Sequence, residues 1–238
     1  MSGAWERNPI DILVATPVSG NDAIYYEWYD HVRNIWFNIP AGLKVVHVRF
    51  PEPCIDIVRD KAINVAHQNG ARWLFFLDAD VIPPADVIPR LLAHNKPIVS
   101  GLYVRRHNPP FNEMLRFNNA GMVAGLSPIQ DGTYQDGSLV ECDAVGTGCV
   151  LIDMEVFEKV KPRQMVLDGQ QCRPQWFVWT EWRQHPGASE DFAFFMHCRK
   201  HGIPVFCDTS IKCKHIGPVK FIHGGNNQMS VEFIGENR

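Results

Sequence analysis

The amino-acid sequence predicts an α/β fold in which a mixed, mostly parallel sheet is flanked by helices. Short apolar runs alternate four times with segments whose apolar residues recur at helical spacing. That alternation is typical of strands joined by crossover helices. Thr16 and Asp78 close two of the apolar runs. Because ligands of such sheets gather at the carboxyl ends of the strands, these polar residues indicate where a site lies.

Four strands and three helices are expected in the first half of the chain. Pro17 and Gly20 end the first apolar run, and on the second helix Val58, Ala62 and Ala66 share one face. The apolar runs that predict strands cover residues 11–16, 44–50, 72–77 and 97–104. The segments with helical spacing cover residues 23–37, 55–69 and 84–95.

The second half is less regular. Residues 106–148 are rich in Asn, Gly and Pro with short β-like pieces, and a long loop with exposed aromatic residues is expected over 161–179. A small-residue loop, VGTGCVLI, precedes a short helix over 153–160. Ser189 is expected to cap a helix over 190–202, whose first turn is acidic and whose last turn is basic. A last strand over 203–208 is followed by a tail rich in basic residues.

Composition excludes several classes of protein. The 238 residues are 45% hydrophobic and 21% charged, which predicts a packed core rather than disorder. A formal net charge of -3 argues against a nucleic-acid partner, because nucleic-acid binders usually carry a basic excess. No apolar run reaches the roughly 20 residues of a membrane span. Seven cysteines without a C-x-x-C pair indicate reduced thiols, so a soluble, cytoplasmic protein is expected.

Two carboxylates, Asp78 and Asp80, follow the third apolar run directly. Like charges this close repel unless a positive charge lies between them. Two oxygen ligands on a tight turn suit Mg²⁺ or Mn²⁺, with phosphate oxygens completing the shell. The alternative is a solvated turn in which Asp80 caps a helix. An EF-hand is disfavoured, since Pro83 occupies the position where that loop needs Gly.

Five segments taken together resemble the metal-dependent GT-A glycosyltransferases, particularly the family 2-like members with a D-x-D motif. These segments are DILVATPV, RDKAINVAHQNGARWLFFLDADV, AVGTGCVLIDMEVFEKV, SEDFAFFMHCRKHGIPVFCD and CKHIG. The resemblance runs in consistent order from Asp11 to Gly217. It implies one catalytic domain, with a nucleotide-binding half over about 11–105, an acceptor-side half over about 106–217 and a C-terminal tail over 218–238.

The resemblance implies a transferase that moves a sugar from a nucleotide-diphosphate-sugar donor to a hydroxyl acceptor. The donor is a UDP- or GDP-sugar, and the acceptor is a glycan or a small molecule. Mn²⁺ or Mg²⁺ would stabilise the departing diphosphate. Asp80 is implied as the principal metal ligand and His215 as a further ligand. Asp78 would reach the metal or the ribose and sugar of the donor.

Other site residues follow from the same resemblance. Asp191 matches the general base of an inverting mechanism, with Glu190 as the second choice, while dipole compensation in a first helical turn is the alternative for both. A retaining mechanism stays open. The nucleoside and the donor sugar are expected to contact Thr16, Pro17, Val18, Asp60, Asn64, Gly146, Thr147 and Gly148. Arg59 is either a nucleotide contact or a surface residue. The glycine loop could instead be an ordinary tight turn. Trp176 and Trp179 either stack on an acceptor sugar or fill the core.

Rival interpretations are weighed on the same residues. A structural zinc site would use the segment from His197 to His215, but its Cys and His spacings do not fit paired knuckles. A sugar nucleotidyltransferase would need a basic residue in the loop TPVSGNDAIYY, which has none. A non-catalytic nucleotide-sugar-binding domain could dispense with Asp191 and His215. A basic rim for a nucleic-acid acceptor would comprise Arg105, Arg106, His107, Lys212, Lys214 and Lys220.

Overall fold

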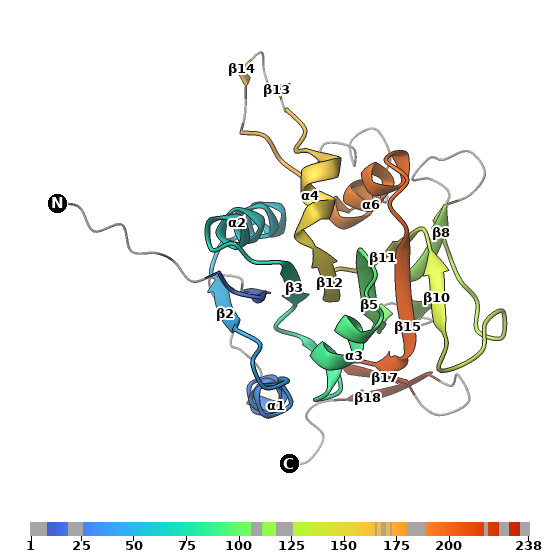
Figure 1. Ribbon diagram of the computed structural model, residues 1–238. Helices are drawn as coiled ribbons and strands as arrows, with labels where there is room; N and C mark the ends of the chain where they lie inside the picture. The colour runs from blue at the N-terminus through green and yellow to red at the C-terminus, as the bar shows by residue number, and fades with distance from the viewer. Residues whose placement is uncertain are drawn as a thin grey trace.

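The computed structural model describes residues 9–18, 26–105, 111–117, 126–164, 166–167, 170–171, 173–179, 189–216, 219–223 and 229–233. A seven-stranded sheet with the order β10-β15-β5-β12-β3-β1-β2 forms its centre (Figure 1). These strands are β1 (Ile12–Pro17), β2 (Val45–Phe50), β3 (Trp73–Leu77), β5 (Ile98–Leu102), β10 (Leu139–Cys142), β12 (Cys149–Asp153) and β15 (Val205–Lys212). Only β10 and β12 run against the other strands, which confirms the mixed, mostly parallel sheet.

Helices cover both faces of this sheet. They are α1 (Tyr26–Phe37), α2 (Ile55–Gln68), α3 (Val87–Ala93), α4 (Met154–Val160) and α6 (Glu190–Lys200). Successive side chains of β3 point to opposite faces, so Leu74 and Phe76 join one core while Phe75 and Leu77 join another. The first core lies under α2, α4 and α6, and the second lies under α1 and α3 (Figure 1).

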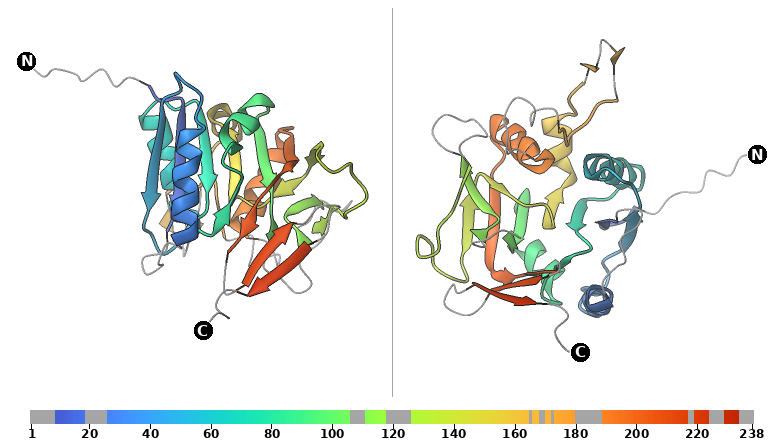
Figure 2. Two further views of the ribbon diagram at one scale, coloured as in Figure 1. Left: turned by 90° about the horizontal axis from the view of Figure 1, so that it is seen from below. Right: turned by 180° about the vertical axis from the view of Figure 1, so that it is seen from behind.

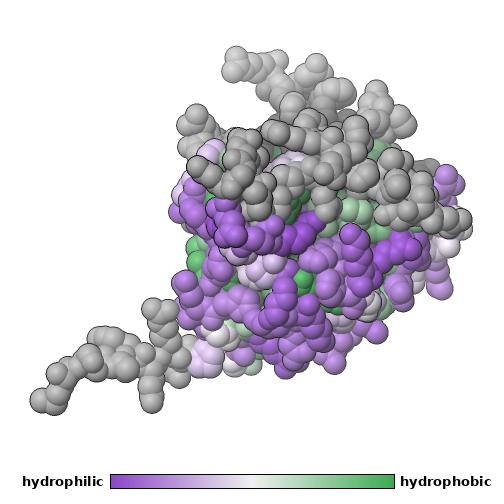
Figure 3. Space-filling view, turned by 90° about the horizontal axis from the view of Figure 1, so that it is seen from above, coloured by the Kyte–Doolittle hydropathy of each residue, from purple (hydrophilic) through white to green (hydrophobic). Residues whose placement is uncertain are grey.

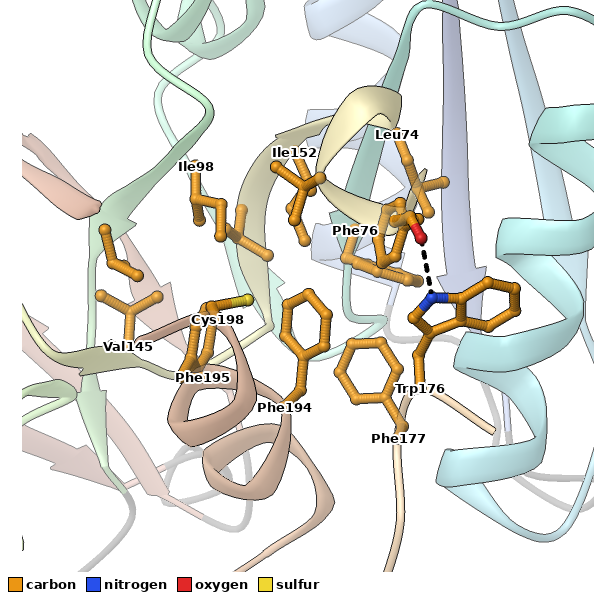
Figure 4. Close-up of a cluster of buried hydrophobic side chains, with 14 of the residues drawn as sticks. Leu74, Phe76, Ile98, Val145, Ile152, Trp176, Phe177, Phe194, Phe195 and Cys198 are labelled. Atoms are coloured by element: carbon orange, nitrogen blue, oxygen red, sulfur yellow. Dashed lines mark hydrogen bonds between the residues drawn. The ribbon is translucent and has the colours of Figure 1, made fainter. Parts of the chain in front are cut away.

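The core beneath α2, α4 and α6 is rich in aromatic rings (Figure 4). The rings of Phe177 and Phe194 stack with centroids 4.6 Å apart, and the Trp176 indole N–H donates to the Phe157 carbonyl at 3.2 Å. Seen from above this layer, the described surface is mainly hydrophilic, with hydrophobic residues between the polar ones (Figure 3). An aromatic interior under a mainly hydrophilic surface agrees with the packed core that the composition predicts.

The two halves of the chain contribute to one sheet. Strand β12 lies between β3 and β5 and pairs antiparallel with both. Strand β15 then pairs parallel with β5 on its other side. The central strands therefore come alternately from the first and the second half, so the two expected halves share one hydrogen-bonded sheet.

The expected C-terminal tail contains strands. Strands β17 (Val219–His223) and β18 (Met229–Phe233) join β16 (Lys214–His215) and β4 (Val81–Ile82) in a four-stranded sheet, visible at the lower edge of the molecule (Figure 2). This sheet was missed because β4 and β16 are far apart in sequence and each has only two residues. This sheet brings residues 81–82, which follow β3, next to residues 214–215, which follow β15.

Short strand pairs fill the segments that the sequence describes as irregular. Strands β8 (Met114–Phe117), β9 (Leu126–Pro128) and β11 (Ala144–Val145) form a three-stranded sheet, and β6 (Val104–Arg105) pairs with β7 (Phe111–Asn112). Strands β13 (Val166–Leu167) and β14 (Gln170–Gln171) pair within the expected long loop. In the described parts of the chain, no helix has both the length and the apolar character needed to cross a bilayer.

Candidate functional site

Asp78 occupies a tightly fixed turn at the carboxyl end of β3. Its backbone N–H donates to the Gly148 carbonyl at 2.9 Å. Its carbonyl accepts from the Trp28 indole N–H at 2.9 Å and from the Val81 N–H at 3.1 Å. The turn is thereby held against the sheet on one side and against α1 on the other, so its carboxylates start from a rigid backbone.

The pairing of β4 with β16 brings His215 to Asp80. His215 lies opposite Val81 in this pair, and the Ile216 N–H donates to the Asp80 carbonyl at 2.6 Å. The Nε2 atom of His215 lies 3.4 Å from an Asp80 carboxylate oxygen, and its Nδ1 atom lies 2.9 Å from the Val104 carbonyl. The sequence therefore identified two residues that the fold does bring together.

The geometry of His215 fits a metal ligand. A carbonyl oxygen only accepts, so Nδ1 carries a proton, and in a neutral imidazole Nε2 then presents a lone pair to Asp80. Two lone pairs face each other stably only when a cation or a proton lies between them. Metal-ligating histidines commonly donate their other N–H to a backbone carbonyl, as His215 does.

The three predicted metal ligands are not equivalent in their surroundings. Within the described ranges, no three His, Cys, Asp or Glu side chains gather closely enough to hold a metal ion. Asp80 and His215 supply one oxygen and one nitrogen, a donor pair that suits Mn²⁺ or Mg²⁺ when phosphate or water oxygens fill the other positions. The full set of Asp78, Asp80 and His215 stays a prediction. The same finding gives no support to a structural zinc site.

A buried arginine supplies part of the positive charge that the carboxylates require. The Arg59 side chain is only 4% exposed, and its guanidinium lies 3.3 Å from an Asp78 carboxylate oxygen and 3.6 Å from a Glu190 carboxylate oxygen. Its carbon Cζ lies 5.1 Å from the Phe76 ring centroid and 5.9 Å from that of Phe177. The surface alternative for Arg59 is thus corrected, because α2 directs this side chain inward.

Charges around Arg59 keep it protonated. Burial acts to lower its pKa, but the charges of Asp78, Glu190 and Asp191 outweigh burial and raise it. The sequence predicts that a metal and a nucleotide balance the charge of the two carboxylates. The structure corrects this, because the Arg59 guanidinium already pairs with Asp78.

Replacing Arg59 with methionine is expected to lower the free energy of unfolding by about 3–5 kcal/mol, because Asp78 and Glu190 lose their buried partner. Urea unfolding at pH 8 measures the change. Arg33→Met is the matched control, since Arg33 is 63% exposed and pairs with the neighbouring Asp30 on α1. The control should change the free energy by under about 1 kcal/mol. Equal losses in the two variants would contradict the buried-pair role.

Glu190 and Asp191 begin α6 but occupy different environments. The Glu190 side chain is 6% exposed and paired with Arg59, and burial together with the charge of Asp191 raises its pKa to about 8. Asp191 is half-buried, and burial raises its pKa although hydrogen bonds oppose the rise. Glu190 is buried and pairs with Arg59, so Asp191 is the more accessible of the two carboxyl groups. The base assignment itself stays a prediction.

Ser189 stands at the predicted N-cap of α6 but uses its hydroxyl differently. It donates to an Asp191 carboxylate oxygen, and no capping hydrogen bond from its side chain to the helix is present. The same Asp191 oxygen accepts the Phe192 N–H at 2.9 Å. Two donors therefore fix the Asp191 carboxylate at the helix N-terminus, where the helix dipole favours its charge.

The loop of Gly146, Thr147 and Gly148 lies against Asp78 and Tyr103. The Tyr103 hydroxyl accepts the Gly148 N–H at 3.0 Å, and a Cβ added to Gly146 would lie 1.9 Å from that hydroxyl oxygen. A Cβ on Gly148 would lie 3.3 Å from an Asp78 carboxylate oxygen. Packing therefore requires these glycines, and it brings the loop to the D-x-D turn.

Glu113 is a site residue that sequence analysis missed. Its side chain is 9% exposed, and one carboxylate oxygen lies 3.3 Å from Nε of Arg105. The other oxygen is buried without a hydrogen-bond partner among the described residues. Burial and the charge of Asp191 raise the pKa of Glu113 to about 7. No spacing marks it in the sequence, where it is a lone acidic residue between the short strands β7 and β8.

The nucleoside assignments are partly corrected. Thr16 is fully buried, and its hydroxyl is engaged with Nε2 of His47 at 2.9 Å. Burial and the nearby Arg49 lower the pKa of His47 to about 4, so the imidazole is neutral. The Thr16 side chain is therefore used inside the protein. Contacts of Pro17 and Val18 with a nucleoside stay predictions, and residues 19–25 of the following loop lie outside the described residues.

Asp60 and Trp176 are both buried and are engaged by other parts of the protein, and for Trp176 this is the core alternative. Asp60 is 1% exposed and accepts the N–H groups of Trp176 at 3.0 Å and Phe177 at 3.2 Å. Trp176 is 9% exposed and packs edge-on against Phe157. Asp60 thus anchors the segment that carries Phe177 to Arg59. Asn64 is exposed on α2 and Trp179 is 40% exposed, so their ligand contacts stay predictions.

The proposed basic rim is paired wherever its side chains are described. Arg105 contacts Glu113 at 3.3 Å, Lys212 contacts Asp136 at 2.8 Å and Lys214 contacts Glu27 at 3.8 Å. Arg106 and His107 lie outside the described residues, and the Lys220 side chain is not described. The neutralised cations give a nucleic-acid acceptor no support.

Buried acids also predict how stability depends on pH. Burial first raises the pKa of Asp60 and Glu113 to about 7 and that of Glu190 to about 8. Because the folded state holds these protons more tightly than the unfolded state, stability is lost as pH rises through these values. His47 and His197 have the opposite effect at lower pH. Burial lowers the pKa of each to about 4, so they reduce stability only as the pH falls below the ordinary histidine pKa of 6.5. The unfolding temperature in EDTA should therefore fall from pH 6.5 to pH 8; a rise over this window would contradict the assignment.

Comparisons with known proteins support the fold. No family model matches the chain, and no curated protein matches its sequence. The solved structure of A197 from STIV is 16% identical, with a TM-score of 0.57 over 96% of this chain and 97% of A197. GalNAc-T7, solved with UDP, GalNAc and Mn²⁺, is 12% identical, with a TM-score of 0.51 over 89% of this chain. The chain spans 45% of the length of GalNAc-T7. The likeness to this glycosyltransferase shows a GT-A fold, as the sequence predicted.

Proposed function

We propose that this chain is a metal-dependent glycosyltransferase that moves a sugar from a UDP- or GDP-sugar to a hydroxyl of a glycan or small molecule. The observation that carries the proposal is the meeting of Asp80 and His215, whose side-chain atoms lie 3.4 Å apart at the carboxyl end of β3. Ligands of open α/β sheets bind at that end. The GT-A neighbour solved with UDP and Mn²⁺ supports this class of ligand.

On the donor side, Asp80 and His215 would hold Mn²⁺ or Mg²⁺. When bound, such an ion supplies the positive charge that stabilises a departing nucleoside diphosphate. Asp78, paired with Arg59, would accept hydrogen bonds from the ribose or sugar hydroxyls of the donor. The glycines at 146 and 148 would let the donor approach the backbone closely.

On the acceptor side, Asp191 would take the proton from the acceptor hydroxyl as its oxygen attacks the anomeric carbon. The new carbon–oxygen bond forms while the bond from that carbon to the phosphate oxygen breaks, and its electron pair leaves with the diphosphate. Attack from the opposite side inverts the anomeric centre. The Glu190–Arg59 pair would hold the start of α6 and thus the position of Asp191.

A thermal-shift screen tests this proposal. The ligands are UDP, GDP, UDP-glucose, UDP-GalNAc and GDP-mannose, each with Mn²⁺ and with EDTA. A cognate ligand at about 100 times its Kd should raise the unfolding temperature by about 5–10 °C with Mn²⁺ and leave it unchanged with EDTA. The same shift in EDTA would remove the metal from the proposal, and no shift with any ligand would contradict donor binding.

Adding UTP and GTP to this screen, and assaying product release in the presence of acceptors, distinguishes two alternatives. A nucleotidyltransferase should bind a nucleoside triphosphate at least as well as the sugar nucleotide. A non-catalytic binding domain should show the metal-dependent shift but release no nucleoside diphosphate when supplied with acceptors. Released nucleoside diphosphate together with a glycosylated acceptor supports the transferase.

A further inference from the structure

Two buried polar atoms without partners lie beside the glycine loop. One is the Oε2 atom of Glu113 and the other is the Oγ1 atom of Thr147, and neither has a hydrogen-bond partner among the described residues. Thr147 is 1% exposed and the Glu113 side chain is 9% exposed. A buried polar group without a partner destabilises a fold, so such a group is usually satisfied by protein, by ordered water or by a bound ligand.

The two residues are joined through Gly146. The Gly146 N–H donates to the Glu113 carbonyl at 3.2 Å, and the Glu113 N–H donates to the Tyr103 carbonyl at 3.0 Å. A Cβ on Gly146 would lie 3.5 Å from Cβ of Glu113. With its backbone fixed at both ends and one oxygen held by Arg105, Glu113 has a single carboxylate oxygen left to accept a hydrogen bond.

Glu113 lies between the two sides of the proposed reaction. Arg105 from β6 pairs with it, and Asp191 from α6 and His215 from β16 are close enough to affect its pKa. Tyr103 links it further to the donor side, because the Tyr103 and His215 rings meet edge-on with centroids 5.5 Å apart. A group bound at Glu113 would therefore lie near both the diphosphate and the base.

We propose that Glu113 and Thr147 bind hydroxyls of the sugar ring at this site and select an uncharged sugar. This inference rests on the proposed function. A sugar hydroxyl can donate to the Glu113 carboxylate, and a second can donate to or accept from Thr147. Because the free Glu113 oxygen and Asp191 are hydrogen-bond acceptors rather than cations, a sugar that carries a carboxylate, such as a uronic acid, is disfavoured.

Isothermal titration with Mn²⁺ tests the inference on the full chain and on Glu113→Gln and Thr147→Val. The probes are UDP, UDP-glucose and UDP-glucuronic acid, or GDP and GDP-mannose if the chain prefers guanine. Each variant should bind the nucleoside diphosphate within about twofold of the natural chain. Glu113→Gln should lose about tenfold or more in affinity for the neutral sugar nucleotide. It should also discriminate less against UDP-glucuronic acid.

Glu155→Gln is the matched control, because Glu155 is 78% exposed on α4, beyond the other end of β12, and pairs with the nearby Lys159. It should change no affinity. A second arm measures the acceptor KM, which distinguishes the two possible sources of the hydroxyls. A loss confined to that KM would keep hydroxyl recognition by Glu113 and assign it to the acceptor sugar.

Three results would overturn the inference. Unchanged affinities and an unchanged acceptor KM in both variants would leave Glu113 and Thr147 without a sugar contact. An equal loss for UDP and for UDP-glucose would indicate a structural role, since no contact specific to the sugar would be missing. Failure of the natural chain to bind any nucleotide would remove the proposed function itself, a result that the unmodified chain alone reports.

Discussion

Replacing Asp80 with asparagine is expected to weaken Mn²⁺-dependent nucleotide binding by about 100-fold and to lower turnover by a further 10²- to 10³-fold. The variant keeps the shape of the side chain and removes the negative charge that faces Nε2 of His215 at 3.4 Å. An amide is a poorer ligand for a hard divalent cation than a carboxylate. Titration of the nucleoside diphosphate with and without Mn²⁺, followed by a turnover assay, measures both effects.

The control for this change is Asp86→Asn. Asp86 is 54% exposed and pairs with Arg90 within the same turn of α3, so its substitution should leave binding within about twofold. A second comparison uses His215→Gln, which should lose metal dependence in the same direction as Asp80→Asn. If Asp80→Asn binds and turns over the donor normally, the two residues meet for structural reasons alone.

Replacing Asp191 with asparagine should lower the rate of transfer by about 10²- to 10⁴-fold while donor binding stays within about twofold. Asparagine can still accept hydrogen bonds from the Ser189 hydroxyl and the Phe192 N–H, so the start of α6 should keep its geometry. It cannot take up a proton from an acceptor hydroxyl. Single-turnover transfer and donor titration on the same sample separate the two effects.

Glu190→Gln is the informative partner of this variant. It leaves Asp191 in place but replaces the carboxyl group that lies 3.6 Å from Nε of Arg59. We expect it to retain most of the transfer rate. The opposite ranking, with transfer lost in Glu190→Gln and kept in Asp191→Asn, would exchange the roles of the two carboxylates.

Local patterns were enough to predict most of the central sheet. The apolar run before Asp78 became β3, whose five residues are all buried, and the helical spacing from Ile55 became α2. Each of these elements is decided by the periodicity of its own side chains. The resemblance also selected Asp80 and His215, which the fold brings together although they are distant in sequence.

Three other residues, whose roles also depend on distant pairing, could not be predicted. Nothing near Arg59 in the sequence shows that α2 turns it toward Asp78 rather than toward solvent. Glu113 becomes part of the site only because its backbone bonds to Tyr103 and Gly146. The resemblance implied Asp60 as a nucleotide contact, but the Trp176 and Phe177 N–H groups bind its carboxylate. In each case the deciding neighbour is remote in sequence.

The position of β12 between β3 and β5 has a consequence for how the molecule forms. During synthesis, β3 and β5 emerge early, but β12, which lies between them and hydrogen-bonds to both, is made much later. Until then each presents an open, apolar edge, which is a template for association with other chains. Such dependence on distant segments slows folding. Chaperone assistance, and poor recovery of fragments that stop before Cys149, are therefore expected of this protein.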